Sequence, residues 1–233
     1  MPNMLFQNSG KGFFEDKTVQ SQVGPLHAPY LSFGCEFIDF DADGWLDIIT
    51  ANGHVQMKGG GLASMNQSKQ LMRNRRDATF VDVAAPEKGD LDRKLIARGV
   101  AVGDVDNDGR LDMLFNNQNG PAQLFHNEDK SKNHWISFKT VGTKSNRDGL
   151  HTRFVITANG MKQTSTVRGG SSYLSASDRR VYFGLGNATT VDKVELTWPS
   201  GTKETLTSLS ADTGYVVTEG KGVTAKQPKG LKP

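Results

Sequence analysis

Two nine-residue segments rich in aspartate contain the residues of this sequence best suited to chemistry. They run from Asp39 to Asp47 and from Asp104 to Asp112, and both fit the pattern D-x-D-x-D-G-x-L-D. Calcium prefers six to eight oxygen ligands at roughly 2.3–2.6 Å, so carboxylates at alternate positions of a tight loop can converge on one ion. The pattern therefore predicts one calcium ion in each segment.

The two segments offer their oxygen atoms in the same order. Carboxylates stand at positions 1, 3, 5 and 9, glycine at position 6 permits a sharp reversal, and the carbonyl group at position 7 adds an oxygen. Full shells of this kind leave little room for the open position that metal catalysis uses, so we expect structural ions. The expected ligands are Asp39, Asp41, Asp43, Trp45 and Asp47 in the first loop, and Asp104, Asp106, Asp108, Arg110 and Asp112 in the second.

Three other interpretations of these loops are less favourable. An EF-hand needs an acidic residue at position 12 and flanking helices, but Thr50 and Phe115 occupy that position. A metal-free turn would leave four carboxylates in nine residues to repel one another. Magnesium fits flexible, carboxylate-rich loops less well than the larger calcium ion does.

The loops belong to an internal repeat, because the loop that starts at Asp39 returns at Asp104. Short apolar or β-branched runs precede and follow each loop and are typical of buried strands. The expected strands are Phe33–Phe40, Leu46–Ala51, Gly99–Val105 and Leu111–Asn116. Further echoes are Leu5–Asn8 with Leu71–Asn74 and Leu124–Asn127, and Phe13–Asp16 with Thr79–Asp82. Four-stranded units that repeat in this way predict β-propeller blades.

A propeller closes into a ring of typically four to eight blades, because one or two blades cannot bury both faces of their sheets. We therefore expect residues 1–130 to be the end of a larger propeller whose polypeptide begins upstream, with any signal peptide there. The segment Met1–Gly10 lacks the charged and then apolar pattern of such a peptide. The stretch Gln56–Gln70 is expected to be an insertion loop between units.

The second half, from Asn133 onward, has no such loop and contains short predicted strands separated by turn signals such as Asn159-Gly160. Strands at this regular spacing indicate a β-sandwich over residues 131–220. Trp198 is expected in its core. The predicted strands are Trp135–Val141, Phe154–Ala158, Gln163–Arg168, Val181–Phe183, Val191–Trp198 and Tyr215–Glu219. The fold class is therefore all-β, with a partial propeller followed by a sandwich.

Composition narrows the possible partners. The net charge is only +3, and part of the basic excess comes from Lys221–Pro233, which has four lysines and no acidic residue. This composition predicts a disordered tail over residues 221–233 rather than a nucleic-acid-binding arm.

No run reaches the roughly 18 apolar residues that a membrane helix requires. Cys35 is the only cysteine, and its apolar surroundings predict a buried side chain.

Several motifs carry family resemblances. The Asp loops, together with the Leu-x-x-Asn segments, resemble FG-GAP/VCBS repeats, which are calcium-binding propeller blades. The second half resembles the ASPIC/UnbV domain, and together the halves resemble the carboxyl-terminal portion of cartilage-acidic-protein-like bacterial proteins. The segment Leu150–Phe154 departs from the usual family pattern. The ASPIC/UnbV motifs are Asn133-His134-Trp135, Val141–Gly149, Arg168–Ser175, Phe183–Gly186 and Trp198–Gly201.

No catalytic centre is predicted. A hydrolase triad drawn from the serines, Asp178 and His151 lacks a G-x-S-x-G elbow and its strand–turn–helix context. Arg168 and Asp178 are expected to form a buried pair or to cap loop backbones. The serines in question are Ser171, Ser172 and Ser175.

The predicted function is that of a calcium-binding, non-enzymatic interaction or adhesion module with an unknown protein or glycan partner. The resemblance implies an extracellular or periplasmic location. Two alternatives stay open: a carbohydrate-binding module, and an accessory protein in enediyne-like secondary metabolism. Only the name of the UnbV domain suggests the second alternative.

Overall fold

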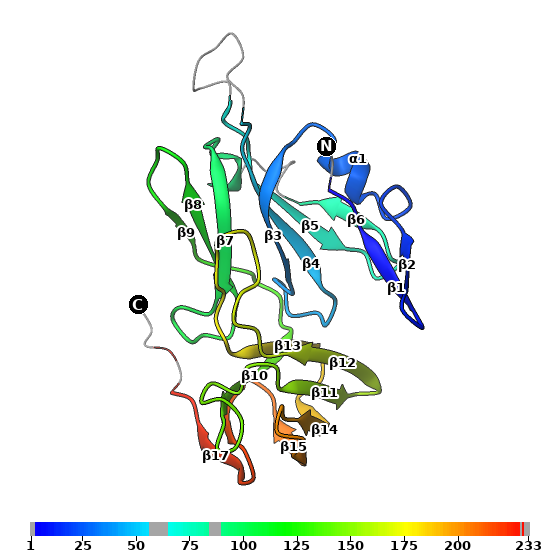
Figure 1. Ribbon diagram of the computed structural model, residues 1–233, viewed down its shortest axis with the longest axis vertical. Helices are drawn as coiled ribbons and strands as arrows, with labels where there is room; N and C mark the ends of the chain where they lie inside the picture. Colours follow the sequence, from blue (N-terminus) through cyan, green and yellow to red (C-terminus); the bar gives the residue numbers. More distant parts are fainter. Residues whose placement is uncertain (1–2, 56–64, 84–89, 229, 231–233) are drawn as a thin grey trace.

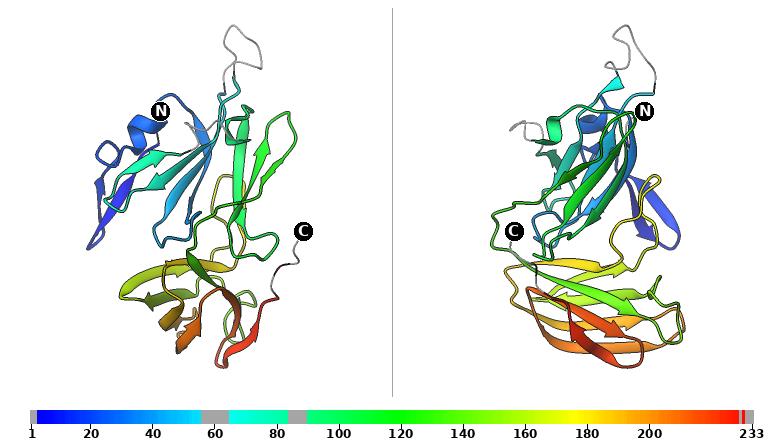
Figure 2. Two further views of the ribbon diagram at one scale, coloured as in Figure 1. Left: turned by 180° about the vertical axis from the view of Figure 1, so that it is seen from behind. Right: turned by 90° about the vertical axis from the view of Figure 1, so that its left-hand side faces the viewer.

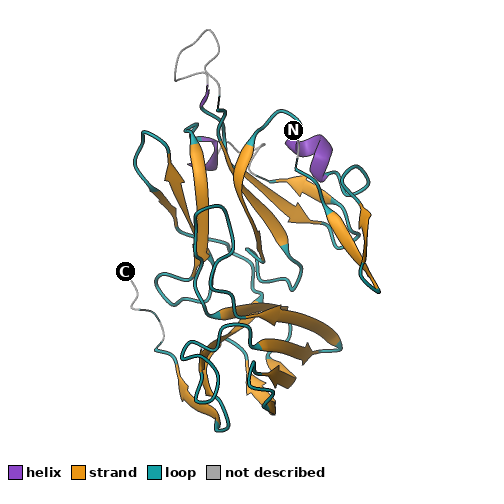
Figure 3. Ribbon diagram, viewed as in Figure 1, coloured by secondary structure: helices purple, strands orange, loops and turns teal. Residues whose placement is uncertain are grey.

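The structure is a computed structural model that describes residues 3–55, 65–83, 90–228 and 230. The described residues are almost entirely strands and loops (Figures 1 and 3), with one short α-helix, α1 (Val23–His27), and a 3-10 turn at Asp90–Asp92. This confirms the all-β prediction. Most of the expected insertion loop, residues 56–64, lies outside the described residues.

Three antiparallel sheets make up the first half of the chain. A two-stranded hairpin and a four-stranded sheet in the order β3-β4-β5-β6 are followed by a three-stranded sheet in the order β7-β8-β9. Each unit is a simple meander in which consecutive strands pair. The strands are β1 (Phe6–Gly10), β2 (Phe13–Asp16), β3 (Ser32–Ile38), β4 (Asp47–Asn52), β5 (Gln70–Asn74), β6 (Phe80–Asp82), β7 (Ala97–Gly103), β8 (Asp112–Asn117) and β9 (Gln123–Phe125).

The segments that repeat in the sequence also pair with the same strand register. The β1–β2 hairpin pairs its residues in the same way as the β5–β6 hairpin does. The matching pairs are Phe6 with Asp16 and Asn8 with Phe14 in the first hairpin, and Met72 with Asp82 and Asn74 with Phe80 in the second. The hairpin β1–β2 is therefore equivalent to the outer half of the four-stranded sheet.

The core of the first half lies between the two larger sheets, where β3 packs beside β7. Its buried residues include Ile38, Ile49, Val100 and Phe115. Along β3 the side chains alternate, so Glu36 and Ile38 are buried while Cys35 is exposed. The prediction of a buried Cys35 was wrong, because the pleat of a strand turns successive side chains to opposite faces.

The second half is a sandwich of two four-stranded sheets (Figure 2). One sheet has the order β13-β10-β16-β17 and the other has the order β12-β11-β14-β15; β10 and β16 run parallel. The strands are β10 (His134–Val141), β11 (Arg153–Ala158), β12 (Met161–Thr166), β13 (Val181–Gly186), β14 (Thr190–Thr197), β15 (Lys203–Ser210), β16 (Thr213–Thr218) and β17 (Gly222–Lys226).

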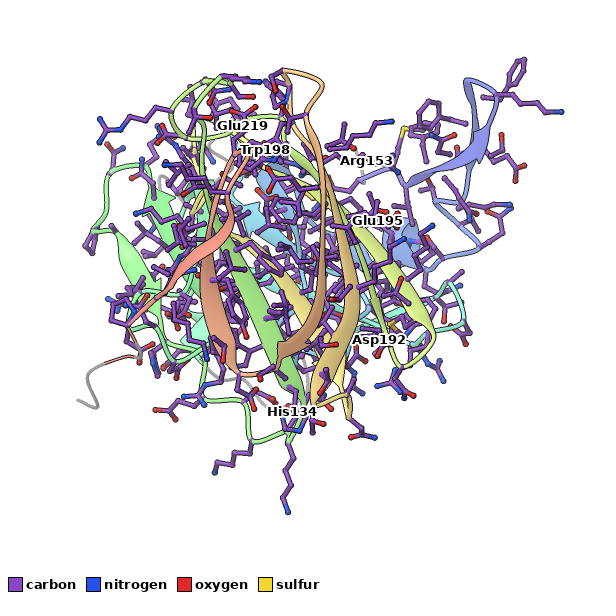
Figure 4. The ribbon with its side chains drawn as sticks, turned by 90° about the horizontal axis from the view of Figure 1, so that it is seen from below. His134, Arg153, Asp192, Glu195, Trp198 and Glu219 are labelled. Atoms are coloured by element: carbon purple, nitrogen blue, oxygen red, sulfur yellow. The ribbon has the colours of Figure 1, made fainter. Side chains whose placement is uncertain are left out.

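The sandwich core is rich in aromatic residues. Phe138 stacks on Phe154 with a centroid distance of 5.1 Å, and Trp198 is buried, as expected. At the same end of the sandwich as Trp198 lies the buried carboxylate of Glu219 (Figure 4). It accepts hydrogen bonds from the backbone N–H groups of Thr143, Lys144 and Ser145 at 2.7–2.9 Å. It therefore holds the 143–145 loop against the end of β16.

The predicted disordered tail is partly ordered. Residues Gly222–Lys226 form β17, which pairs with β16 at the edge of a sheet. The pairing uses backbone groups, and the side chains of β17 are nearly all exposed. An edge strand of this kind needs few apolar residues, so its polar composition gave no signal. In the part of the chain that the structure describes, no helix is long and apolar enough to cross a membrane.

Candidate metal sites

The first Asp loop connects β3 to β4 and is folded by its own aspartates. Asp39 accepts backbone hydrogen bonds from Asp43 and Gly44 at 3.0 and 2.9 Å, and Asp43 accepts one from Trp45 at 2.8 Å. Ala42 and Gly44 have positive φ angles of 54° and 90°, which glycine adopts without strain. These bonds curl the chain so that side chains at positions 1, 3 and 5 face inward.

The second Asp loop connects β7 to β8 and repeats this geometry. Asp104 accepts bonds from the N–H groups of Asp108 and Gly109, both at 3.0 Å, and Asp108 accepts one from Arg110 at 2.8 Å. The φ angles of Asn107 and Gly109 are 59° and 94°, close to those of the first loop. Strands flank both loops, which agrees with the rejection of an EF-hand.

The structure brings most of the predicted carboxylates together. Ligand atoms of Asp39, Asp41 and Asp43 lie within 4.8 Å of one another, as do those of Asp104, Asp106 and Asp112. Asp108 groups instead with Asp106 and His126. The position 7 residues, Trp45 and Arg110, follow the loop glycine, and their N–H groups bond to the position 5 aspartates. These clusters consist almost entirely of oxygen donors, and they fit a hard cation such as calcium.

The carboxylates of the first loop are electrostatically strained without a cation. Burial, reinforced by the neighbouring aspartates, raises the pKa of Asp39 to about 8. Burial also raises the pKa of Asp47 to about 7, although hydrogen bonds from Asn74 and Phe40 oppose the shift. In the second loop, burial raises the pKa of Asp104 to about 6, with Arg180 opposing it. An ion among these groups would remove this penalty.

Basic side chains pair with carboxylates of both loops. Arg76 lies 2.7 Å from Asp43, and Arg110 pairs with Asp108. His126 Nε2 lies 3.0 Å from Asp106 Oδ2, and this hydrogen bond raises the pKa of His126. These basic groups offset part of the negative charge of the two loops.

Two asparagines missed by the ligand prediction hold the position 9 aspartates. The N–H of Asn74 donates to Asp47 Oδ1 at 2.7 Å, and that of Asn127 donates to Asp112 Oδ1 at 2.8 Å. Their side-chain amides donate to the carbonyl oxygens of Leu46 and Leu111 at 3.1 and 3.2 Å. The signal was present in the repeated Leu-x-x-Asn segments, but nothing in the sequence linked that asparagine to a loop.

The sandwich rests on the first loop. A Cβ atom at Gly184 would lie 2.1 Å from Asp39 Oδ2, so only glycine permits this approach. The N–H of Gly186 donates to the carbonyl of Ala42 at 3.0 Å, and the side chain of Asn133 donates to the carbonyl of Asp41 at 2.8 Å. The Phe183–Gly186 motif is therefore a contact surface for the Asp loop.

The sandwich also rests on the second loop. A Cβ atom at Gly109 would lie 1.8 Å from the ring of Trp135, so the indole packs directly on the loop glycine. Arg180 donates to the carbonyl of Asp104 and to Asn107 Oδ1, both at 2.6 Å. Both Asp loops thus lie in the joint between the two halves of the chain.

A third contact comes from the Arg168–Asp178 segment, which extends from the sandwich along β3 and β7 (Figure 1). Ser172 Oγ accepts from the N–H of Cys35, and Ser177 Oγ accepts from the N–H of Val102, both at 3.0 Å. Of the two expected roles of Arg168 and Asp178, a buried pair and the capping of loop backbones, the structure shows only the second, and only for Asp178. Arg168 is exposed and its nearest acid is Glu36 at 3.8 Å, whereas Asp178 caps the N–H of Arg180.

The serines considered for a hydrolase triad have other partners. Ser171 bonds to Ser177 at 2.9 Å, Ser172 accepts from Cys35, and Ser175 donates to the carbonyl of Tyr173 at 2.9 Å. These bonds shape the segment and seat it against β3 and β7. They do not form a nucleophile–base pair with His151.

The fold and the site define an all-β chain whose two Asp loops support a β-sandwich. Residues 142–224 match the model of the ASPIC and UnbV family.

The chain is also similar to cartilage acidic protein 1. The mouse protein (Mus musculus) is 24% identical over 262 residues, which cover 86% of this chain and 38% of the relative. The Xenopus tropicalis protein is 36% identical over 74 residues, 32% of this chain and 11% of the relative. The human protein (Homo sapiens) is 46% identical over 55 residues, 24% of this chain and 8% of the relative. This chain therefore spans well under half the length of these relatives.

Proposed function

We propose that this chain binds two calcium ions, one in each Asp loop, as structural ions. The observation that carries the proposal is the pair of matching loops. Each has four aspartates at the same positions, the same internal hydrogen bonds and the same pair of positive φ angles.

Calcium in this position would stabilise the joint between the halves. The carbonyl groups of Asp41, Ala42 and Asp104 accept hydrogen bonds from the sandwich. An ion that fixes the loops also fixes these acceptors. The two ions therefore stabilise the contact between the repeat sheets and the ASPIC/UnbV domain.

At the level of the whole protein, the repeat sheets are FG-GAP/VCBS blades of a β-propeller. The module is non-enzymatic and works outside the cytoplasm, in the extracellular space or the periplasm, as an interaction or adhesion surface. Support comes from the repeat register and from the similarity to cartilage acidic protein 1. Its partner is a protein or a glycan.

Isothermal titration of calcium into the chelated protein tests the proposal. Two sites are expected, and Asp43→Ala and Asp108→Ala should each remove one. Asp192→Ala is the control, because Asp192 lies on β14 of the sandwich (Figure 4) and its carboxylate accepts from the N–H of Asn159 rather than from either loop. Unchanged binding in the two loop variants would contradict the assignment, and tighter binding of magnesium than of calcium would contradict the choice of ion.

A further inference from the structure

A cavity of about 140 Å³ lies in the joint between the two halves of the chain. Its walls come from β3, β7 and β13 and from the Arg168–Asp178 segment, which extends along β3 and β7 (Figure 1). Arg168 and Gly170 are exposed at its margin, so the cavity is open to solvent. Its lining includes Glu36, Ile38, Val102, Ser171, Ser177 and Val181.

Glu36 brings a buried carboxylate with an unused oxygen to this cavity. Its side chain is only 8% exposed, and Oε2 has no hydrogen-bond partner among the described residues. Its ion-pair partner is the exposed Arg168, whose Nη1 lies 3.8 Å from Oε1, too far for a hydrogen bond. A buried polar group without a partner is unfavourable, and a buried charge is more so. Glu36 Oε2 therefore needs a donor that the described residues do not supply.

The electrostatics of Glu36 agree with this geometry. Burial raises the pKa of Glu36, and hydrogen bonding with Ser171 and the charge of Arg168 oppose the shift without cancelling it. The positive charge near this carboxylate is thus too small to offset its burial. A cation beside Oε2 would favour the ionised form of the carboxyl group.

The remaining lining combines hydroxyl groups with apolar walls. Ser171 Oγ and Ser177 Oγ lie 2.9 Å apart, and the N–H of Val102 holds Ser177 by donating to its Oγ at 3.0 Å. The side chains of Ile38, Val102 and Val181 are buried and apolar. One charged acceptor, two neutral acceptors and apolar walls fit a ligand with a single cationic end and a short hydrocarbon body.

A divalent metal ion fits this cavity poorly. Calcium and magnesium need several charged or carbonyl oxygens around one point. Two further acids line the cavity, but Asp39 accepts from N–H groups of its own loop, and Asp178 accepts from Arg180 Nε and the Tyr182 hydroxyl at 2.5 and 3.2 Å. Glu36 is the lining acid that has a buried oxygen without a partner among the described residues. A singly charged group matches this single carboxylate.

We propose that this cavity binds a primary ammonium group on a short alkyl chain. The ammonium has three N–H donors, one each for Glu36 Oε2, Ser171 Oγ and Ser177 Oγ, and the alkyl chain packs on the apolar walls. An apolar cavity of about 150 Å³ holds a molecule as large as benzene, so a ligand of about six non-hydrogen atoms fits. A free alkylamine and the end of a lysine side chain both have this chemistry. The ammonium contacts none of the expected calcium ligands, so the proposal is independent of the proposed function.

Titration of n-butylammonium into the isotope-labelled full chain, followed by NMR in the presence of calcium, tests the proposal. The amide resonances of Glu36, Ser171 and Ser177 should shift until the site is saturated. Both n-butanol, which lacks the charge, and tetramethylammonium, which lacks N–H donors, should bind roughly tenfold more weakly. Nα-acetyl-lysine methylamide distinguishes the two sources of the ammonium group. Its binding would indicate a lysine side chain of a partner, and binding of n-butylammonium alone would indicate a free amine.

Variants of the two charged residues complete the test. Glu36→Gln keeps the shape of the side chain but removes its charge, and it should weaken n-butylammonium binding roughly tenfold. Glu195→Gln, on the exposed surface of β14, is the matched control. Arg168→Gln removes a competing cation and should strengthen binding roughly twofold to fivefold, a gain that also tests the site if Glu36→Gln does not fold.

Three results would overturn the proposal. The first is the absence of saturable shifts with n-butylammonium. The second is equal binding of n-butylammonium and n-butanol, which would show that the cavity selects only for the alkyl chain. The third is an affinity for n-butylammonium that stays unchanged in Glu36→Gln or falls in Arg168→Gln, because either outcome would show that Glu36 is not the counter-ion.

Discussion

At the scale of single residues, polar side chains with several partners decide the local structure. The Asp loops are folded by their own aspartates, and Asp39 and Asp104 each accept backbone hydrogen bonds on both carboxylate oxygens. Behind them, Asn74 and Asn127 fix the position 9 aspartates. In the sandwich, the carboxylate of Glu219 likewise fixes the 143–145 loop, because it accepts hydrogen bonds from three of its backbone N–H groups.

Asn127, which holds Asp112 of the second Asp loop, provides the first prediction. Asn127→Ala keeps the backbone N–H that donates to Asp112 but removes the side-chain amide that holds the carbonyls of Leu111 and Phe40. It should therefore weaken calcium binding at the second loop by about tenfold, the lower end of what partners of metal ligands contribute. The first loop should change little. Calorimetric titration measures both sites, and Asn116→Ala, an exposed asparagine on β8, is the control. An equal loss in both variants would contradict a specific role for Asn127.

Glu219 provides a pH-dependent prediction. Burial opposes its ionisation, but hydrogen bonds from Ser145, Ser200, Thr143 and Lys144 hold the pKa of Glu219 well below its ordinary value of 4.5. A carboxyl group with a depressed folded pKa stabilises the protein above its unfolded pKa, and this contribution is lost as the pH falls. Glu219→Gln should therefore lower the free energy of unfolding by roughly 2–3 kcal/mol at pH 7.

The difference between wild type and Glu219→Gln should shrink between pH 5 and pH 3. Urea denaturation at several pH values measures it. If the difference in free energy of unfolding between wild type and Glu219→Gln stayed constant across that range, the charge of the carboxylate would not contribute to stability. Glu195→Gln is the control, because Glu195 pairs with Lys193 on the exposed surface of β14.

At the scale of elements, the glycines of the two Asp loops face different neighbours. Both have positive φ angles, 90° at Gly44 and 94° at Gly109. A Cβ at Gly44 would meet the flexible Met161 side chain at 2.8 Å, whereas a Cβ at Gly109 would enter the ring of Trp135. The same motif position is therefore more constrained in the second loop.

These different neighbours predict that alanine at Gly44 and at Gly109 lowers the free energy of unfolding by unequal amounts. Gly44→Ala should destabilise the protein by roughly 1–2 kcal/mol through backbone strain, while Gly109→Ala should cost roughly 3–5 kcal/mol because overpacking is added to that strain. Urea denaturation measures both. Adding Trp135→Ala should recover part of the Gly109→Ala loss, so strictly additive costs would argue against the contact.

The elements that could be predicted from the sequence are those whose pattern lies within one short segment. The Asp loops and the strands beside them follow from residue type and spacing within about ten positions. Contacts between distant segments could not be predicted in this way. Asn74 lies 27 residues from the aspartate that it holds, and Gly184 approaches a loop of the other half of the chain. Strand β17 pairs through its backbone, which composition does not reveal.

At the scale of the whole molecule, both halves meet at the two loops, so the charge state of the loops should control the stability of the chain. In the calcium-free protein, the pKa values of Asp39, Asp47 and Asp104 are raised to about 8, 7 and 6. A carboxyl group with a raised folded pKa favours folding when protonated. This contribution is complete below its unfolded pKa of 3.8 and is lost as the pH rises through the folded value.

The final prediction follows from the direction in which stability changes with pH. Without calcium, the urea midpoint should fall as the pH rises from 5 to 8. With saturating calcium the trend should reverse, because protons compete with the ion for the same oxygens and binding stabilises the folded state. Asp39→Asn with Asp47→Asn should flatten the calcium-free curve. A calcium-free midpoint that rises steadily across this range would show that the buried carboxylates are not strained, and would remove the electrostatic argument for an ion between them.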